Sequence, residues 1–382
     1  MSKIYELIKE KCQNGVEYRK LEDCCTVLDK KRKPVTKAAR EAGEYPYYGA
    51  NGIQDYVSDY IFDGTFILVG EDGSVITKAG TPVVTWAKGK IWVNNHAHII
   101  EGTDDVLLRY LFHYVQTIGV TPLIHGNIPK LTGRDFRALQ IPVPPLEVQR
   151  EIVKTLDNFT ELKAELETEL IKRKQQYEHY RDHLLSFENI TSRGGQVEWL
   201  PLKELCKVNR GKRVVRSQLS KNKKDGFPVY QNSLKPLGYF NEYNCEAKKA
   251  FVICAGAAGE IGYSEVNFWA ADDCSYFTCD SKISERYLYH VLMNNHNYLS
   301  SKVRRSSIPR LSKELIENIK VPVPTKDIQA RIVYVLDNFD AVCHDLNIGL
   351  PAEIKARQKQ YEYYRDRLLS FDAVVSGTEG GG

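Results

Sequence analysis

The chain has 382 residues, of which 42% are hydrophobic and 27% are charged, and its formal net charge is +4. This length predicts two or three domains with their own cores, and the composition is that of an ordinary globular protein. The sequence has no apolar run long enough to cross a membrane, and its first residues lack the apolar centre of a signal peptide. We therefore expect a cytoplasmic protein. Nine cysteines without zinc-ligand spacing predict reduced thiols.

After a short amphipathic segment at residues 1–14, two strand-rich regions open in the same way, at residues 16–21 and 197–202. Each region has three short β-rich runs separated by turns that contain glycine, and then one helical stretch. In the first region these are residues 66–69, 82–86, 90–93 and 106–117, and in the second they are residues 250–254, 262–264, 276–278 and 285–295.

Both regions close on the same two motifs. Ile-Pro-Lys-Leu at 128–131 matches Ile-Pro-Arg-Leu at 308–311, and a Pro-Val-Pro exit follows at 142–144 and 322–324. Matches that recur at a nearly constant offset are typical of an internal repeat. The sequence therefore predicts two α/β domains built from one duplicated unit.

A long helical segment follows each Pro-Val-Pro. Apolar residues at heptad spacing extend from Ile152 to Phe187 and again from Ile332 to Phe371, which predicts coiled-coil helices. We expect the two helices to pair antiparallel about a pseudo-twofold axis and to hold the domains apart as a spacer.

The two helices resemble each other most at their ends. Ten of the thirteen residues at 176–188, Gln-Tyr-Glu-His-Tyr-Arg-Asp onward, recur at 360–372. The second helix has four extra residues, which form a stutter, and Gly349 and Pro351 lie inside it. Proline removes a backbone donor and clashes with the preceding turn, so we predict a kink or break at that point.

Three weaker motifs bear on whether the chain carries out chemistry itself. The Gly-rich stretch 256–262 lacks the following helix that a dinucleotide-binding loop requires, so a turn between strands is expected. Asp345 and Glu353 have a nuclease-like spacing but lie on a helical segment, where carboxylates would not converge on one cation. No Asn-Pro-Pro-aromatic tetrapeptide, which resembles the motif of amino-methyltransferases, is present. We therefore expect no catalytic residue and no metal site in this chain.

The basic loops are the stronger signal. The two long helical segments are slightly acidic, so the positive charge falls on the two domains. Lys and Arg neutralise phosphates, and Arg, Asn and Gln pair with purine edges, so loops rich in these residues suit duplex DNA. A solvated basic face is the alternative for any single loop. The expected DNA contacts are Lys78, Lys88, Asn94, Asn95, His96, His98, Asn127, Lys130 and Arg134 in the first domain, and Arg210, Lys212, Arg213, Arg216, Lys223, Lys224, Arg304, Arg305, Ser306 and Arg310 in the second.

Taken in order, these features resemble the DNA-specificity subunit of type I restriction-modification enzymes. The resemblance covers about residues 16–372 and is carried by the repeated Gln-Tyr-Glu stretch, by Leu-Asp-Asn-Phe at 156–159 and 336–339, by the Pro-Val-Pro exits, and by Gly-Leu-Pro-Ala-Glu-Ile at 349–354. The first helix lacks the Gly-Leu-Pro insertion of the second, so the two helices need not offer equivalent surfaces for docking other subunits.

The resemblance implies an α+β fold with two α/β target-recognition domains joined by two long antiparallel coiled-coil helices. The expected divisions are domain 1 at 1–145, the central helix at 146–190, domain 2 at 191–324, the C-terminal helix at 325–372 and a flexible tail at 373–382.

The family's function implies that each domain reads half of a bipartite DNA target and that the helices dock two methyltransferase subunits, with restriction subunits added. The polar residues beside the seam, Glu178, Arg181, Glu362 and Arg365, are the expected docking residues. The chain itself would bind no cofactor, and S-adenosylmethionine, ATP and Mg²⁺ would bind to its partners.

Several alternatives remain open at this point. The chain could serve a related methylation or restriction complex outside type I. It could also be a methyltransferase or nuclease that acts alone, or a coiled-coil interaction protein without a role on DNA. The uneven charge disfavours the last of these.

Overall fold

The computed structural model describes residues 2–73, 75–187, 197–304, 307–345 and 347–373. It divides into two compact units: unit 1 consists of Met1–Glu165 and Ile354–Gly382, and unit 2 of Leu166–Glu353. The division falls inside helices α5 (Leu146–Ser186) and α11 (Leu350–Leu368), so each unit contains one β-rich domain and parts of both helices. Among the helices described, none is both long and apolar enough to cross a lipid bilayer.

Unit 1 is built on a six-stranded sheet with the strand order β2-β7-β5-β6-β3-β4. All neighbours are antiparallel except β3 and β6, which run parallel. A separate pair, β1 and β10, places the strand that opens the domain beside its Pro-Val-Pro exit. The bounds are α1 Ser2–Lys11, β1 Glu17–Lys20, α2 Leu21–Cys24, β2 Thr26–Val27, β3 Ala42–Gly49, β4 Gly52–Val57, β5 Phe62–Gly70, β6 Val84–Val93, β7 Ala97–Glu101, α3 Leu108–Val115, β8 Ile124–His125, β9 Lys130–Leu131, α4 Gly133–Arg137 and β10 Gln140–Val143.

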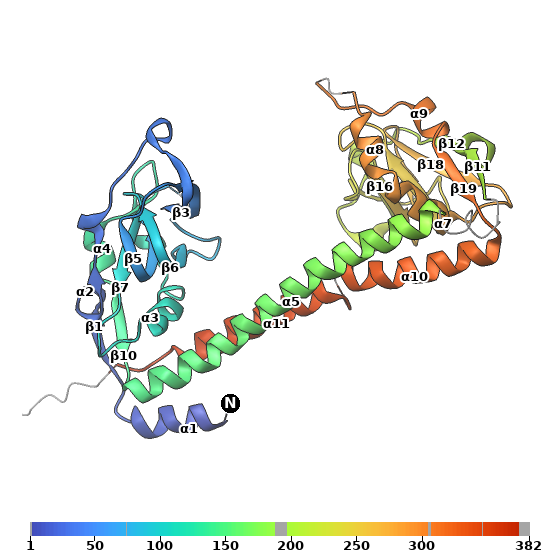
Figure 1. Cartoon of the computed structure of the whole chain (residues 1–382). Helices are drawn as coiled ribbons and strands as arrows, with labels where there is room; N and C mark the ends of the chain where they lie inside the picture. The colour runs from blue at the N-terminus through green and yellow to red at the C-terminus, as the bar shows by residue number, and fades with distance from the viewer. Residues whose placement is uncertain (1, 74, 188–196, 305–306, 346, 374–382) are drawn as a thin grey trace, which may run out of the picture. The chain divides into compact units, whose positions relative to one another are not determined.

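Strand β5 explains the continuous apolar run at 66–69. Ile67 and Val69 belong to the core beneath α3, whereas Phe66 and Leu68 belong to a second core on the opposite face. A strand that is covered on both faces is apolar at every position instead of alternating. Helix α3 lies beside β5 and β6, as Figure 1 shows.

Strand β6 corrects one expectation from the sequence. The runs at 82–86 and 90–93 were expected to be separate strands, but residues 84–93 form one continuous strand through Gly89. Gly89 (φ +85°) pairs with Gly64 (φ +156°) on β5. Two facing residues without side chains can take this strained backbone without ending the ladder, so a glycine that signalled a turn lies inside a strand.

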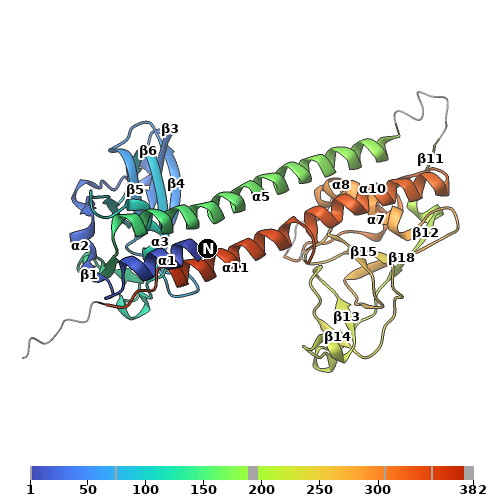
Figure 2. The same cartoon turned by 90° about the horizontal axis from the view of Figure 1, so that it is seen from below.

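Unit 2 repeats this plan with more breaks in the strands. It has a four-stranded sheet, β12-β18-β15-β16, a three-stranded sheet, β14-β13-β17, and the pair β11 and β19. Figure 2 shows β13 and β14 at one end of the unit, apart from β15 and β18. The bounds are β11 Glu198–Pro201, β12 Cys206–Arg210, β13 Phe227–Tyr230, β14 Gly238–Phe240, β15 Lys249–Ile253, β16 Ile261–Ser264, β17 Trp269–Ala270, β18 Cys274–Cys279, α7 Glu285–Asn294, α8 His296–Ser301, α9 Lys313–Glu317, β19 Lys320–Val323 and α10 Lys326–His344.

Equivalent strands can be assigned from the pairing. β13 runs parallel to β17 in unit 2 as β3 does to β6 in unit 1, and β16 pairs with β15 as the first half of β6 does with β5. The single strand β6 is therefore divided into β16 and β17 in unit 2. The Gly-rich stretch 256–262 joins β15 to β16, which confirms the predicted turn.

One buried glutamine ties each domain to the start of the helix that follows it. In unit 1, the side-chain amide of Gln149 donates to the carbonyl oxygens of Asp105 (3.2 Å) and Pro144 (2.8 Å), and its oxygen accepts the N–H of Leu107 (2.9 Å). Gln329 makes the three matching contacts in unit 2. These bonds fix the direction in which each long helix leaves its domain.

A polar cluster joins α3 to both long helices within unit 1. Arg109 Nε and His113 Nε2 donate to the same oxygen of Asp157, at 2.7 and 2.8 Å, and the hydroxyl of Tyr361 lies 3.0 Å from His113 Nδ1. Asp157 belongs to the Leu-Asp-Asn-Phe motif and Tyr361 to the repeated Gln-Tyr-Glu stretch. Both motifs thus hold the β-rich domain of unit 1 against the parts of the helices in the same unit.

The matching cluster of unit 2 is incomplete. Arg286 and His290 donate to Asp337, both at 2.7 Å, as in unit 1. However, the hydroxyl of Tyr177 and the Nδ1 atom of His290 are both buried without a hydrogen-bond partner among the described residues. The repeat is therefore conserved in its ion pair but not in its tyrosine contact.

Apolar residues of the predicted heptad positions meet within each unit. In unit 1, the ring of Phe159 stacks on Tyr364 with centroids 5.3 Å apart, and the start of α5 shares a core with the end of α11. In unit 2, Tyr177 and Tyr180 contact Phe339, at 6.4 and 5.3 Å.

The predicted break in the second helix is confirmed, because α10 ends at His344 and α11 begins at Leu350. The carboxylate of Asp345 accepts the N–H of Ile348 (3.3 Å), and the N–H of Gly349 donates to the carbonyl of Asp345 (3.1 Å). A Cβ on Gly349 would lie 2.4 Å from the carbonyl oxygen of Ala341, so this turn requires glycine.

Two of the four expected docking residues are engaged within the chain. The side chains of Arg181 and Arg365 are only 15% and 16% exposed, and each pairs with the aspartate that follows it. Arg181 also donates to Asn294 (3.2 Å). Glu178 and Glu362 are exposed. That these four residues dock other subunits stays a prediction.

Candidate nucleic-acid interface

A cleft of about 500 Å³ opens in unit 1 where the β3–β4 turn, the end of β5 and the loop before β9 meet. The residues that line it come from segments that are far apart in the sequence, and most of them are polar. The residues that line it are Ala50, Asn51, Gln54, Asp72, Gly73, His96, Ile128 and Lys130. The sequence singled out His96 and Lys130. It missed Asn51, Gln54 and Asp72, although Asn51-Gly52 is a hairpin signal that could have drawn attention to this turn.

The Ile-Pro-Lys-Leu motif forms one wall of this cleft. The N–H of Leu131 donates to the carbonyl of Glu71 (2.8 Å), and the N–H of Gly73 donates to that of Pro129 (3.0 Å). Strand β9 is thereby held against the end of β5, which leaves Ile128 68% exposed at the rim. An exposed isoleucine beside amides and a lysine suits a surface that meets bases as well as phosphates.

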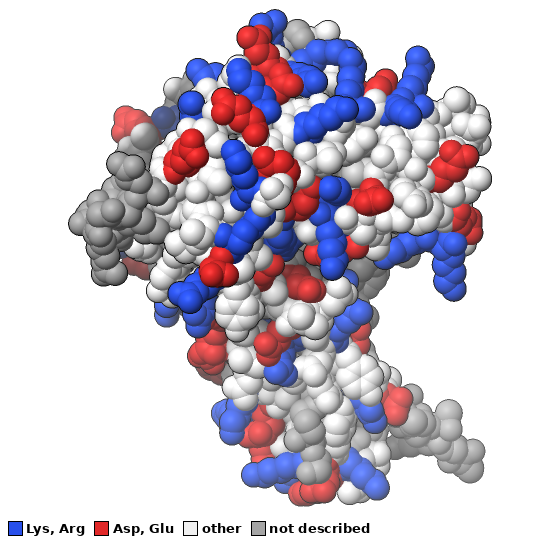
Figure 3. All heavy atoms as spheres, turned by 90° about the vertical axis from the view of Figure 1, so that its right-hand side faces the viewer, with Lys and Arg blue, Asp and Glu red and all other residues white. Residues whose placement is uncertain are grey.

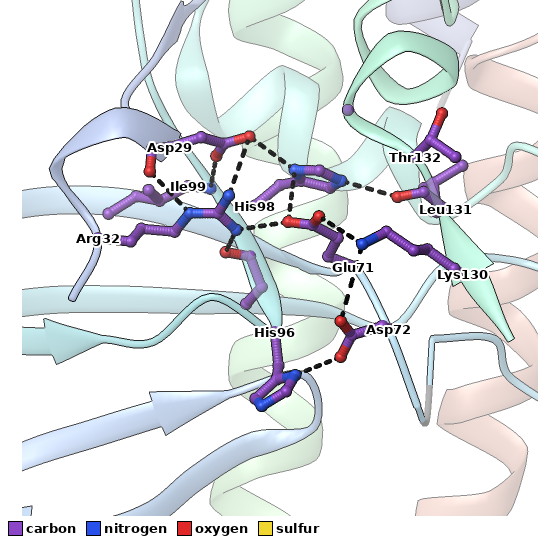
Figure 4. Close-up of polar contacts among 12 residues, drawn as sticks. Asp29, Arg32, Glu71, Asp72, His96, His98, Ile99, Lys130, Leu131 and Thr132 are labelled. Carbon is purple, nitrogen blue, oxygen red and sulfur yellow. Dashed lines mark hydrogen bonds and ion pairs between the residues drawn. The ribbon is translucent and has the colours of Figure 1, made fainter. Parts of the chain in front are cut away.

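Behind the cleft lies a buried charged network (Figure 4). Arg32 donates to Glu71 (2.6 Å) and lies 3.6 Å from Asp29, and its side chain is only 12% exposed. His98 Nδ1 lies 2.7 Å from Asp29, and Lys130 reaches Glu71 at 3.3 Å. Arg32 is therefore a structural residue that joins the loop after β2 to the sheet.

Asp29, Glu71 and His98 are residue types that bind metal ions, and their ligand atoms lie within 4.8 Å of one another. In this chain, the guanidinium of Arg32 already supplies the positive charge between the carboxylates. Burial alone would raise the pKa of Asp29, but hydrogen bonds from His98 and the N–H of Ile99 outweigh it and lower that pKa. The network is best explained as an internal ion pair.

Two expected DNA contacts are wrong because the residues are buried. His98 has no exposed surface, stacks on Phe136 with centroids 4.2 Å apart, and uses both ring nitrogens on Asp29 and the carbonyl of Leu131. Asn94 is 3% exposed. His98 lies on β7, and Asn94 directly follows β6. A sequence pattern of adjacent polar residues therefore did not distinguish buried supporting residues from surface residues.

His96 does face the cleft. Its Nδ1 contacts a carboxylate oxygen of Asp72, and Lys130 lies 3.9 Å from the other oxygen of Asp72. The contact with Asp72 leaves Nε2 of His96 as the ring atom that can meet a ligand. Together with the two amides, this gives the cleft both donors and acceptors of hydrogen bonds.

The other expected contacts of unit 1 are exposed but do not line this cleft. Lys78 lines a different cavity, with Glu362 and Arg365 of α11, and Lys88 lies beside Gly89 on β6. Asn95, Asn127 and Arg134 are exposed on the loops and on α4.

The corresponding surface of unit 2 keeps the backbone but changes the chemistry. The N–H of Leu311 donates to Cys254 and that of Gly256 to Pro309, as Leu131 and Gly73 do in unit 1. Arg310 bridges to Ala255 where Lys130 bridges to Asp72. The strand pairing of the two units also aligns their other residues. Asp273 in unit 2 corresponds to His96 in unit 1, and Ala271 corresponds to Asn94. In the charged network, Cys254 corresponds to Glu71 and Arg210 to Asp29.

The expected basic contacts of unit 2 that the structure describes are all exposed. These are Arg210, Lys212, Arg213, Arg216, Lys223, Lys224, Arg304 and Arg310. Arg305 and Ser306 lie outside the described residues. Figure 3 shows Lys and Arg side chains gathered on the upper part of the face it presents, with several Asp and Glu among them.

Comparison with known proteins agrees with this arrangement. A family model described as "Type I restriction modification DNA specificity domain" matches the chain twice, at residues 13–173 and 196–356. A Haemophilus influenzae protein named as a type I restriction enzyme specificity subunit is 34% identical over 93% of this chain and 96% of its own length. A Mycoplasma pneumoniae type I specificity subunit is 26% identical over 92% of this chain and 97% of its own.

A solved structure shares the fold. The type I restriction-modification S subunit from M. genitalium superposes with a TM-score of 0.65 over 93% of this chain and 96% of its own, at 18% identity. The two matches to the family model correspond to the internal repeat expected from the sequence. This chain therefore belongs to the family of type I restriction-modification DNA specificity subunits.

Proposed function

We propose that each unit reads one half of a bipartite DNA sequence, and that the chain directs a modification and restriction complex to that sequence. The observation that carries this proposal is that the two units have one backbone plan but different side chains at equivalent surface positions. A duplicated reader of two identical half-sites would keep His96 and its equivalent alike, whereas that equivalent is Asp273. The target is accordingly asymmetric.

The long helices would set the gap between the half-sites. The start of α5 packs with the end of α11 in unit 1, and the end of α5 packs with α10 in unit 2. These contacts support an antiparallel coiled coil, which would act as a spacer of fixed length between the readers.

The exposed faces of these helices would dock two methyltransferase subunits. Glu178 and Glu362 occupy equivalent places in the repeat and are exposed, and Tyr334, Tyr363 and Ile348 are large exposed apolar residues on or between the helices. Exposed aromatic and apolar residues with polar residues around them are typical of protein interfaces.

The chemistry of the complex would belong to its partners. Methyltransferase subunits would bind S-adenosylmethionine, and restriction subunits would use ATP and Mg²⁺, while this chain supplies DNA recognition in the cytoplasm. The buried charged network of unit 1 holds the recognition loops in place and takes no part in a reaction.

The proposal is tested by mapping methylated adenines in the host genome with and without this chain. We expect one bipartite asymmetric motif to lose methylation when the chain is absent. Replacing residues 206–311 with the matching segment of another family member should then change one half of the motif only. A methylation pattern that is identical with and without the chain would reject the proposal.

A further inference from the structure

Gln54 occupies a special place at the mouth of the cleft in unit 1. It lies on β4 (Gly52–Val57), is exposed, and lines the cleft beside Asn51 and His96. Its side-chain amide fills the space beside Gly49, where an added Cβ would be only 2.0 Å from Nε2. The absence of a side chain at Gly49 therefore makes room for this amide.

A buried residue fixes which way the amide of Gln54 points. Asn94 is 3% exposed, and its Oδ1 accepts the N–H of His96 at 2.8 Å. Its Nδ2 must therefore be the donor toward Gln54, whose Oε1 lies 3.3 Å away. A long exposed side chain usually samples many rotamers, but this one accepts a hydrogen bond from a partner that is itself buried.

The oriented amide keeps the groups that DNA would use. Oε1 has a second lone pair, and Nε2 donates to none of the residues that the structure describes. An acceptor and a donor on one planar amide match N6–H and N7 of adenine in the major groove, which is the paired contact that glutamine makes with that base.

We infer that Gln54 reads an adenine in the half-site of unit 1, and that Asn94 is its positioning residue. This inference rests on the proposed function and adds to it the base and the residue pair. The pair belongs to unit 1 alone, because the position of Asn94 is Ala271 in unit 2. Gln54 has no Cα partner, since it lies in the register shift between Tyr47 and Tyr48; by chain order its counterpart is Leu237, the residue before the partner of Val229.

Unit 2 also shows that the backbone does not need the buried asparagine. The N–H of Ala271 donates to the carbonyl of Tyr230 at 2.9 Å, and that of Asn94 donates to Tyr48 at 3.0 Å. Asn94→Ala therefore places alanine where unit 2 already has it, with the same backbone hydrogen bond. A loss of discrimination in this variant would then reflect base reading and not misfolding.

The test uses the complete complex and the motif found by methylation mapping. Binding is measured to duplexes that carry each base at every specified position, for the wild type, Gln54→Ala, Gln54→Glu and Asn94→Ala. Gln140→Ala is the control, because Gln140 is an exposed glutamine of the same unit outside the cleft.

Gln54→Ala should lower the discrimination at one A·T position of one half-site by about 5- to 150-fold, the range expected for a paired base contact, and leave all other positions unchanged. Gln54→Glu should shift the preference there toward cytosine, because a carboxylate accepts from its N4. Asn94→Ala should reduce discrimination at the same position by a smaller factor, and Gln140→Ala should have no effect.

Three results would overturn the inference: unchanged discrimination in Gln54→Ala, an effect at a G·C position, or an equal loss at every position. Any of these would leave the proposed function intact. That function fails separately if the wild-type complex has no motif that depends on this chain.

Discussion

The two tyrosines of the repeat differ in their hydrogen bonding, and this difference predicts opposite effects of the same substitution. In unit 1, the hydroxyl of Tyr361 donates to Nδ1 of His113, since Nε2–H of that ring donates to Asp157. Tyr361→Phe removes this bond and leaves Nδ1 unpaired in a ring that has no exposed surface. A lost bond together with a stranded buried acceptor should destabilise unit 1 by about 1–3 kcal/mol.

Tyr177→Phe is the matched control within the same chain. The hydroxyl of Tyr177 is buried without a partner among the described residues, so its removal costs no hydrogen bond and relieves an unpaired polar group. We expect this substitution to change stability by between zero and about 1 kcal/mol in the stabilising direction.

Urea unfolding of the full chain gives the size of each effect, and amide hydrogen exchange locates it. Peptides that cover α3 report on unit 1, and peptides that cover α7 report on unit 2. Tyr361→Phe should speed exchange in α3 and leave α7 unchanged. Equal destabilisation by the two substitutions, or a larger cost for Tyr177→Phe, would refute the argument from hydrogen bonding.

Three further predictions concern other features. Gly349→Ala should destabilise the chain by about 1–3 kcal/mol in urea unfolding, because its Cβ would overlap a backbone carbonyl, whereas Gly119→Ala, with open space around it, should not. Arg304→Ala should weaken DNA binding by the complex about equally for all sequences and reduce the slope of log K against log salt by about one, and an unchanged slope would remove this residue from the interface. Burial lowers the pKa of His113, so stability should be lost as the pH falls below about 6.5, by at most about 1.4 kcal/mol per pH unit for this proton; His113→Asn should flatten that part of the urea profile. Burial alone would raise the pKa of Asp157, but hydrogen bonds from His113 and Arg109 outweigh it and lower that pKa. A second loss of stability should therefore follow below about pH 4, where the carboxylate is protonated in the unfolded chain.

Much of the fold could be predicted because the sequence is an internal repeat, so each structural motif occurs in both halves. The Pro-Val-Pro exits, the paired loops and the heptads each occur in both halves, and the structure places each pair in equivalent elements. The break near Gly349 was predictable for a local reason, since proline and glycine act on their own turn. Strand β6 was not, because whether Gly89 ends a strand depends on what faces it, and Gly64 is 25 residues away in sequence.

The cleft was only partly predictable, because burial is decided by tertiary contacts. His96 and His98 are two residues apart, yet one is 47% exposed in its side chain and the other is fully buried. The heuristic that basic and amide residues mark DNA contacts selected Lys130, which lines the cleft, but not Gln54, which lies on β4 outside any basic run. Its importance follows from Asn94 and Gly49, and neither contact can be seen without the fold.

Under the proposed function, the residues that attach each domain to its helices differ from those that would read DNA, so one backbone plan could serve two targets. The glutamine and the Arg–His–Asp cluster that attach each domain to its helices are the same in both units, and none of these residues lines the cleft. Residues that line the cleft can therefore change without disturbing the contacts that attach the domain. Leu237 and Ala271 in unit 2 are such a change: the oriented amide is lost while β13 and β17 keep the pairing of β3 and β6. Giving unit 1 the same pair, by Gln54→Leu with Asn94→Ala, should consequently alter one half-site and leave the gap length of the motif unchanged.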